Sequence, residues 1–391
     1  MKSIITGVIL LVITAKIESQ NSENGAEKKV VCYYTNWSTY RQGRAKFSAQ
    51  NIDPYLCTDI IYAFATFSDD KLVASDPYED LENNGYKKFN DLKQINNKLK
   101  TTLSIGGTAE GPVAFSNIAA SKDKIDTFTK SAIDLLRLYN FDGLNIDWHY
   151  PGNKPEDKEN YVTFVKTLKE EFEKEAKLSG KPRLLITMSL PSKSQVIEKG
   201  YDLLNLQKYV DYFNILCYDY HELHKNKVSH HSPLFSQRQA INTDNGKINS
   251  DASVQFLLDK GVMKEKINLG IPTYGRIFKL KNTDNHGFGA PIKDDGNQEI
   301  GFKAYYDICK IIKDEKWTVV QVNQTASGPY AYKGEDWIAY DDENIARRKG
   351  SYVRSRGLGG VMFWTVDDDD FNGDCGKGKF PIIKATKEGL V

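Results

Sequence analysis

The chain has 391 residues, a formal net charge of +1 at pH 7 and 40% hydrophobic residues, of which Tyr, Phe and Trp are a large part. A chain of this size folds as one large domain or two average ones. Because the charge is balanced and no basic stripe is interleaved with aromatic residues, we do not expect nucleic acid as a partner.

The amino-terminal residues form two segments that precede the fold. Within residues 1–19, Lys2 precedes the apolar run 4–14, and small and polar residues follow it; this order predicts a cleaved secretory signal peptide. The run is too short to span a bilayer. Residues 20–29 form a polar leader without an apolar period. We therefore expect a secreted, extracellular protein that starts near Val30 and is not attached to a membrane.

Short runs of β-branched and aromatic residues recur along the rest of the chain, separated by longer segments with helical periodicity. The runs are 30–35, 60–64, 101–105, 143–148, 184–190, 212–218, 267–271 and 360–364. Among the intervening segments, the clearest helix is predicted over 155–180, with Tyr161, Phe164, Leu168 and Phe172 on one face. Such alternation indicates parallel strands joined by crossovers, and eight units predict an α/β fold of the (β/α)8 barrel type.

One connection is much longer than a crossover requires. Tyr274 and the helix expected near Asn344 are about 70 residues apart, and the runs 317–322 and 337–340 between them are typical of strands. We therefore predict a small α+β domain, residues 276–343, inserted after the seventh strand of a barrel that occupies residues 30–391.

The sequence FDGLNIDWHYP, residues 141–151, contains the fourth predicted strand. Leu144 and Ile146 alternate with Asn145, Asp147 and His149, so the polar side chains point away from the apolar face. A row of polar groups on the inner face of a strand is costly unless the groups are hydrogen-bonded or perform chemistry. Since barrel proteins place their sites at the carboxyl ends of the strands, the functional site is predicted here.

This stretch resembles the signature of glycoside hydrolase family 18, the chitinases and chitinase-like proteins, which is Asp-x-x-Asp-x-Asp-x-Glu. The matching residues are Asp142, Asn145, Asp147 and His149, so a His replaces the proton-donating Glu and an Asn replaces the second Asp. The resemblance extends over about 30–376. Thr108 is a further departure, because the family commonly has a Trp after Ser-Ile-Gly-Gly.

The resemblance implies a role for each matching residue. In the family the N-acetyl group of the sugar attacks the anomeric carbon while the Glu protonates the leaving oxygen. Asp147 is thus implied to orient the acetamide, Tyr218 to hydrogen-bond it, and Asp219 and Arg276 to hold hydroxyl groups. The residues implied to be flat platforms for sugar rings are Tyr33, Trp37, Tyr274 and Trp364. No cofactor is implied, and no Cys or His spacing resembles a metal site.

The departures decide the functional prediction. Loss of general acid catalysis costs about 10² to 10⁴ in rate, and we expect His149 to be a core residue hydrogen-bonded to Asp147. We therefore predict a monomeric chitinase-like lectin that binds chitin or N-acetylglucosamine oligosaccharides without hydrolysing them. Two alternatives stay open: an active or residual endo-N-acetylglucosaminidase that uses His149, and a growth-factor-like or scaffold protein that no longer binds sugar.

The five cysteines of a secreted chain suggest disulfides with one thiol left over. Sequence alone does not fix the pairing, but the resemblance implies Cys32 with Cys57 and Cys309 with Cys375. Cys217 is then a small buried apolar residue.

Two sequons, at Asn36 and Asn323, offer acceptor sites for glycosylation. We favour Asn323, which lies in the insertion, because Asn36 is expected to lie against the site between Tyr33 and Trp37.

Overall fold

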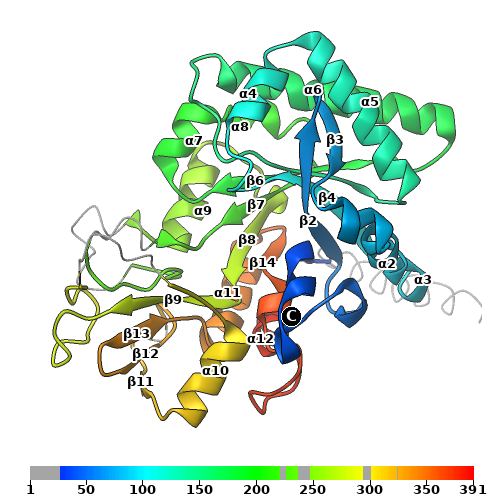
Figure 1. Cartoon of the computed structure of the whole chain (residues 1–391). Helices are drawn as coiled ribbons and strands as arrows, with labels where there is room; N and C mark the ends of the chain where they lie inside the picture. The colour runs from blue at the N-terminus through cyan, green and yellow to red at the C-terminus, as the bar shows by residue number, and fades with distance from the viewer. Residues whose placement is uncertain (1–26, 221–225, 237–246, 294–300, 324) are drawn as a thin grey trace, which may run out of the picture.

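The computed structural model describes residues 27–220, 226–236, 247–293, 301–323 and 325–391 (Figure 1). The predicted signal peptide, 1–19, and most of the predicted leader, 20–29, lie outside the described residues. Among the described helices, none is long and apolar enough to span a membrane.

Eight parallel strands form a closed barrel, as predicted. They are β1 (Lys29–Thr35), β2 (Asp59–Ser68), β4 (Lys100–Gly106), β5 (Gly143–Asp147), β6 (Leu185–Pro191), β7 (Tyr212–Leu216), β8 (Ile267–Pro272) and β14 (Gly360–Trp364). Each strand pairs with the next, and β14 pairs with β1 to close the barrel. In this register Asn145 lies opposite Ser104 on one side and Thr187 on the other. A short strand, β3 (Lys71–Ala74), extends β2 antiparallel.

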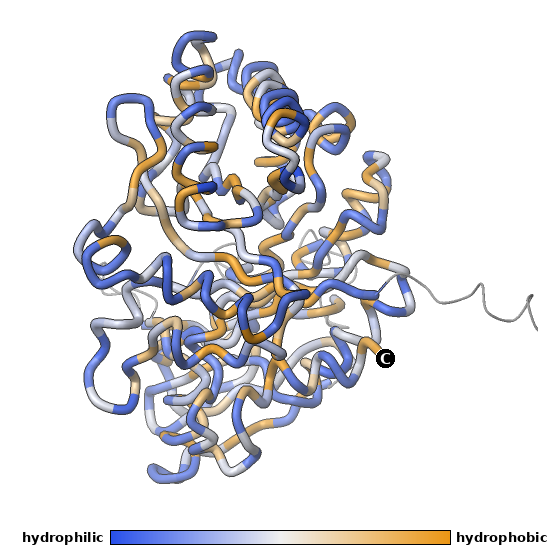
Figure 2. Tube along the Cα trace, turned by 90° about the vertical axis from the view of Figure 1, so that its right-hand side faces the viewer, coloured by the Kyte–Doolittle hydropathy of each residue, from blue (hydrophilic) through white to orange (hydrophobic). Residues whose placement is uncertain are grey.

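Helices cover the outside of the barrel (Figure 1). They are α2 (Gly85–Asn90), α3 (Leu92–Ile95), α4 (Val113–Ala119), α5 (Lys122–Leu138), α6 (Asp157–Ser179), α7 (Ser194–Gly200), α8 (Leu203–Leu206), α9 (Ser250–Asp259), α11 (Glu343–Arg356) and α12 (Pro381–Leu390). Figure 2 shows hydrophilic and hydrophobic residues alternating along them, the pattern of helices with one buried face. Helix α6 ends at Gly180, whose φ of +69° lies in the left-handed region that glycine adopts without strain.

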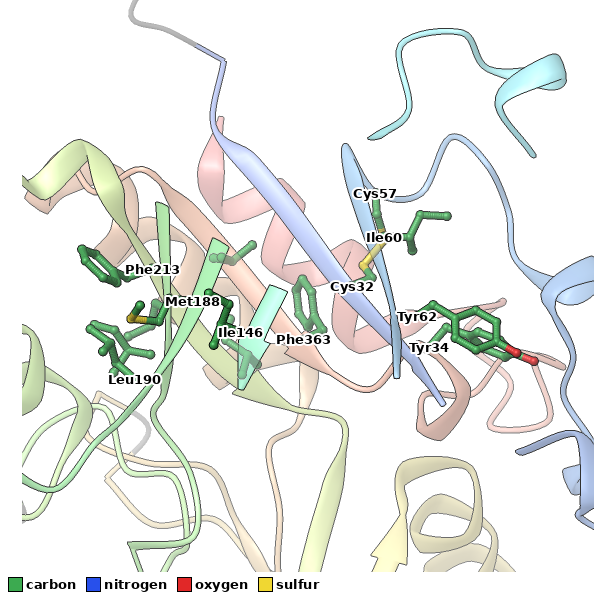
Figure 3. Packing of buried hydrophobic residues seen from close by; sticks show 14 of the residues in the cluster. Cys32, Tyr34, Cys57, Ile60, Tyr62, Ile146, Met188, Leu190, Phe213 and Phe363 are labelled. Carbon is green, nitrogen blue, oxygen red and sulfur yellow. A yellow bond between two sulfur atoms is a disulfide. The ribbon is translucent and has the colours of Figure 1, made fainter. Parts of the chain in front are cut away.

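The apolar side chains of β5 pack outward against this helical layer. Trp148 stacks on Phe115 of α4, with ring centroids 5.2 Å apart, and meets Tyr161 of α6 at 4.8 Å. In Figure 3, Ile146 and Met188, which are register partners on β5 and β6, lie side by side in the same layer. Because Leu144, Ile146 and Trp148 face outward, the alternating polar residues of β5 face the barrel interior.

The insertion is an antiparallel sheet beside the barrel (Figure 1). Its elements are β9 (Tyr274–Lys279), β10 (Gly301–Ala304), α10 (Tyr305–Asp314), β11 (Thr318–Val320), β12 (Tyr330–Lys333) and β13 (Asp336–Ala339), with strand order β10-β9-β13-β12-β11. Strand β9 starts at Tyr274, directly after barrel strand β8 ends at Pro272. The insertion is thus continuous with the carboxyl end of the barrel.

The predicted disulfides are confirmed. Cys32 is bonded to Cys57, which Figure 3 shows linking β1 to the segment before β2, and Cys309 is bonded to Cys375. Cys217 is free and buried. Burial raises the pKa of its thiol to about 11, so Cys217 behaves as an unreactive core residue.

Replacing both Cys32 and Cys57 by Ala should lower the free energy of unfolding by about 3 kcal/mol, because the bond closes a 25-residue separation in the unfolded chain. Guanidinium unfolding measures this, and Cys217→Ala is the control for losing a buried sulfur. Cys309→Ala with Cys375→Ala spans 66 residues and should cost about 1 kcal/mol more. Equal unfolding midpoints for both double variants and wild type would contradict the prediction.

Candidate functional site

The site is built on the carboxyl end of β5, where the structure brings Asp147 and His149 together. The Nε2 atom of His149 lies 2.9 Å from Oδ1 of the buried Asp147 carboxylate, a close ion pair rather than a well-aligned hydrogen bond. On the other side of the ring, Nδ1 lies 3.2 Å from the hydroxyl of Thr108, which follows β4. Both nitrogens of the imidazole are therefore occupied by protein groups.

The charge of Asp147 controls the protonation of His149. Burial of the imidazole lowers the pKa of His149, but the charge and contact of the Asp147 carboxylate outweigh burial, so the net shift is upward. The ring thus carries its proton to higher pH than an exposed His, and it uses that proton to neutralise Asp147.

Below Asp147, Asn145 lies at the centre of a buried polar network inside the barrel. Its amide nitrogen donates to the hydroxyls of Tyr33 and Ser104, each at 2.9 Å, and its carbonyl accepts from Thr187 at 2.8 Å. The Tyr33 hydroxyl is also 2.9 Å from Ser189. The network joins β1, β4, β5 and β6, and it gives both the nitrogen and the oxygen of the amide hydrogen-bond partners.

Asp142 does not lie with the other three residues of the signature. It precedes β5, at the amino-terminal end of the barrel, where its Oδ2 accepts hydrogen bonds from Lys93 and from the main-chain nitrogen of Thr101, both at 2.9 Å. Its contacts tie β5 to β4 and to α3. Its role is structural, because the length of the strand separates it from Asp147.

Aromatic rings from the turn after β1, from β2 and from β14 form a cluster at the carboxyl end of the barrel. Trp37 and Trp364 both face Phe64, at centroid distances of 6.1 and 5.9 Å with nearly parallel planes. Trp37 is 44% exposed and Trp364 is half-buried. Phe64 was not predicted from the sequence, because nothing in its strand separates a ring at the site from a core ring.

Two rings expected to be sugar platforms are instead buried. Tyr33 is 1% exposed, because its side chain points into the barrel toward Asn145, and Tyr274 is 2% exposed between Tyr218 and Phe302. The exposed face in this region is Phe302 of β10, which is 47% exposed and stacks on Tyr274 at 4.8 Å. Phe302 was not predicted from the sequence, because only the pairing of β10 with β9 brings it to this region.

The Tyr218 hydroxyl is buried and has no hydrogen-bond partner within the described residues. Burial raises the pKa of Tyr218, and the charges of neighbouring groups, among them Asp147, add to the shift. The hydroxyl therefore stays protonated and keeps an unused hydrogen-bond donor.

Asp219 and Arg276 form a bidentate ion pair beside these rings. The guanidinium donates from Nε and from a terminal nitrogen to the two carboxylate oxygens, at 2.7 and 2.8 Å, and lies over the Tyr274 ring at 5.1 Å. Burial alone would raise the pKa of Asp219, but the contacts with His231 and Arg276 outweigh it and hold the pKa well below its usual value. The pair thus presents a fixed, charged edge to the site.

One cluster of three metal-ligating side chains occurs in the described part of the chain: Cys309, Asp370 and Cys375. The two sulfurs are joined in a disulfide, and Asp370 accepts hydrogen bonds from the main chain of Gly373 and Cys375. The cluster is structural and does not fit a metal ion.

The chain matches one known protein family over most of its length. The family described as glycosyl hydrolases family 18 matches residues 29–369. The chain belongs to this family. Among its family 18 relatives, mouse chitotriosidase-1 is 36% identical over 375 residues, which cover 94% of this chain and 79% of that protein.

Solved family 18 structures match the whole fold. The Group IV chitinase of Ostrinia furnacalis, solved in complex with allosamidin, has a TM-score of 0.87 and 34% identity, covering 93% of this chain and 99% of that one. Human YKL-39, described as a pseudo-chitinase with retained chitooligosaccharide binding properties, has a TM-score of 0.86 and 35% identity, covering 93% and 100%. The chain is therefore about equally similar to a chitinase and to a protein described as a pseudo-chitinase.

The position of Asp142 yields a test. Asp142→Asn removes the charge that accepts from Lys93 and Thr101, so the free energy of unfolding should fall by about 1 to 3 kcal/mol. Affinity for chito-oligosaccharides should stay at the wild-type value, because the residue lies at the other end of the barrel. Urea unfolding and calorimetry measure the two quantities, and an affinity lost without loss of stability would contradict the structural role.

The raised pKa of His149 predicts a pH-dependent stability. A group whose pKa is higher in the folded state stabilises fully below its unfolded pKa, about 6.5 for His, and this contribution is lost as the pH rises through the folded pKa. The wild type should therefore have a higher free energy of unfolding than His149→Gln. This difference should be larger at pH 5 than at pH 9. A difference that grows with pH would show that the ring is not held by Asp147.

Proposed function

We propose that the protein is a secreted lectin that binds chitin or N-acetylglucosamine oligosaccharides without hydrolysing them. The observation that carries the proposal is the position of His149 between Asp147 and Thr108, with both ring nitrogens taken by protein groups. No proton of this ring is directed toward a glycosidic oxygen, while polar and aromatic groups suited to an N-acetylated sugar surround it.

The absence of hydrolysis follows from two features of β5. A general acid must reach the atom that it protonates, within about 3 Å, and the His149 ring is held against Asp147 instead. Asn145, with its amide fully hydrogen-bonded, has no proton to exchange with Asp147, so that carboxylate cannot be tuned by a partner as in a pair of acids.

Sugar binding is supported by the groups that remain. The unpartnered Tyr218 hydroxyl suits an acetamide oxygen, and the Asp219–Arg276 pair suits sugar hydroxyls. Trp37, Trp364 and Phe302 supply apolar faces for pyranose rings. A few fixed polar groups among aromatic walls are typical of small-molecule sites.

The extracellular setting is part of the proposal. The two disulfides suit an oxidising compartment, and Asn323 is exposed and suited to glycosylation, whereas Asn36 is buried and donates to Asp80 at 3.0 Å. We propose a monomer, with no nucleic acid, membrane or cofactor among its partners.

Calorimetry with chitohexaose, together with a fluorogenic chito-oligosaccharide assay from pH 4 to 8, tests the proposal. We expect binding without turnover, and Trp364→Ala should weaken binding by about 1 to 3 kcal/mol, the range for stacking on aromatic side chains. The control is Tyr55→Ala, which removes a ring that is 65% exposed just before β2, at the amino-terminal end of the barrel. Its affinity should equal that of the wild type.

The alternatives predict different outcomes. Turnover that His149→Ala abolishes would make the protein an enzyme that uses the His as its acid. An undetectable heat at millimolar chitohexaose, together with no retention on chitin beads, would favour the scaffold or growth-factor-like protein.

A further inference from the structure

Two adjacent histidines, His230 and His231, lie buried between the barrel and the insertion, behind the Asp219–Arg276 pair. Their rings stack at a centroid distance of 5.6 Å with nearly parallel planes. Both lie among the segments that carry the candidate site, yet neither matches any residue of the family signature. Their contacts are alike at Nε2 and differ at Nδ1.

His230 is held neutral by two backbone contacts. Its Nε2 lies 3.0 Å from the carbonyl oxygen of Tyr340, which only accepts, so Nε2 carries a proton. Its Nδ1 accepts from the main-chain nitrogen of Ser232 at 3.0 Å, so Nδ1 carries none. In agreement, burial, followed by the charges of His231 and Lys349, places the pKa of His230 well below its usual value.

His231 has one nitrogen fixed in the same way and the other facing a carboxylate. Its Nε2 lies 3.1 Å from the carbonyl oxygen of Tyr274 and therefore carries a proton. Its buried Nδ1 has no hydrogen-bond partner within the described residues and lies 3.6 Å from Oδ1 of Asp219. A neutral ring would direct a lone pair at that carboxylate, whereas a protonated ring directs an N–H at it.

We propose that His231 is a positioning residue for the sugar-binding pair, and that its protonated ring holds Asp219 from the inner side while Arg276 holds it from the outer side. The inference rests on the proposed function, since it assumes that Asp219 and Arg276 contact sugar. Asp219 has a φ of +59°, in the left-handed region that Asp adopts more readily than most residues, and its carboxylate is held there by Arg276. Protonation of His231 thus strengthens sugar binding at mildly acidic pH.

The surrounding charges allow this protonation. Several titratable or charged groups lie around His231. They are Asp219 after β7, Tyr274 and Arg276 of β9, Asp341 after β13 and Lys349 of α11, together with the neutral His230. The ring lies near two carboxylates, and each is already paired with a cation: Asp219 with Arg276 and Asp341 with Lys349. These two pairs are charge-balanced, so a proton on His231 adds a net positive charge beside Asp219.

The protein itself provides the first test. Nitrogen NMR of selectively labelled histidines from pH 5 to 8, with signals assigned by His231→Asn, reports the state of each ring. We expect His230 to remain the neutral Nε2–H tautomer and His231 to gain a proton at Nδ1 toward pH 5. A His231 that stays neutral throughout overturns the proposal, whether or not sugar binds.

Affinity provides the second test. Because His149 also titrates beside the site, chitohexaose binding is measured in a His149→Gln background, with and without His231→Asn. We expect His231→Asn to weaken binding about tenfold at pH 5.5, the scale of one lost charge-assisted contact, and by much less at pH 8. The control, His286→Gln, changes a half-buried His of the insertion that contacts Tyr330, and its profile should match the background.

The outcomes separate the two proposals. Equal loss of affinity at both pH values in His231→Asn, with an unchanged fold by circular dichroism, makes His231 a packing residue and overturns the inference. Binding that is absent from the wild type at every pH refutes the proposed function, and the NMR experiment then decides the state of His231 alone.

Discussion

The structure depends on one constraint, which is that polar side chains inside a closed barrel must find partners within it. Asn145 meets this constraint by bonding to Tyr33, Ser104 and Thr187 on three other strands. An unpaired amide there would cost about 1 to 3 kcal/mol. The network fixes the height and orientation of β5, and the side chain directly above it, Asp147, is therefore presented at the carboxyl end in one position.

Above that network, the two carboxylates of the site, Asp147 and Asp219, each require a compensating positive group. The Asp147 carboxylate is buried, and His149 supplies the neutralising group that burial requires. This use of the His149 proton is the basis for the proposed lack of hydrolysis. Asp219 is compensated from a different part of the chain, by Arg276 of the insertion, so its charge can be kept without blocking the neighbouring Tyr218 hydroxyl.

The aromatic cluster is also held by buried charge. Arg41, shortly after Trp37, donates to the carboxylates of Asp367 and Asp368, both at 2.8 Å, shortly after Trp364. Burial raises the pKa of Asp368 to about 7, and the charge of Asp367 adds to the effect. This ion-pair network joins the segments that follow Trp37 and Trp364, so it helps to fix the positions of the two rings.

The sequence by itself determined the barrel, because eight strands and their helices follow from local periodicity, and α6 ends at Gly180 as its pattern indicates. It also determined which residues of β5 face inward, since side chains alternate along any strand. Four features were decided only by tertiary structure. They are the burial of Tyr33 and Tyr274, the distance of Asp142 from the site, the stacking of Phe302 on Tyr274, and the contact of His231 with Asp219. Each depends on which segments meet in space, and periodicity along one segment carries no information about the partner across the barrel or in the inserted sheet.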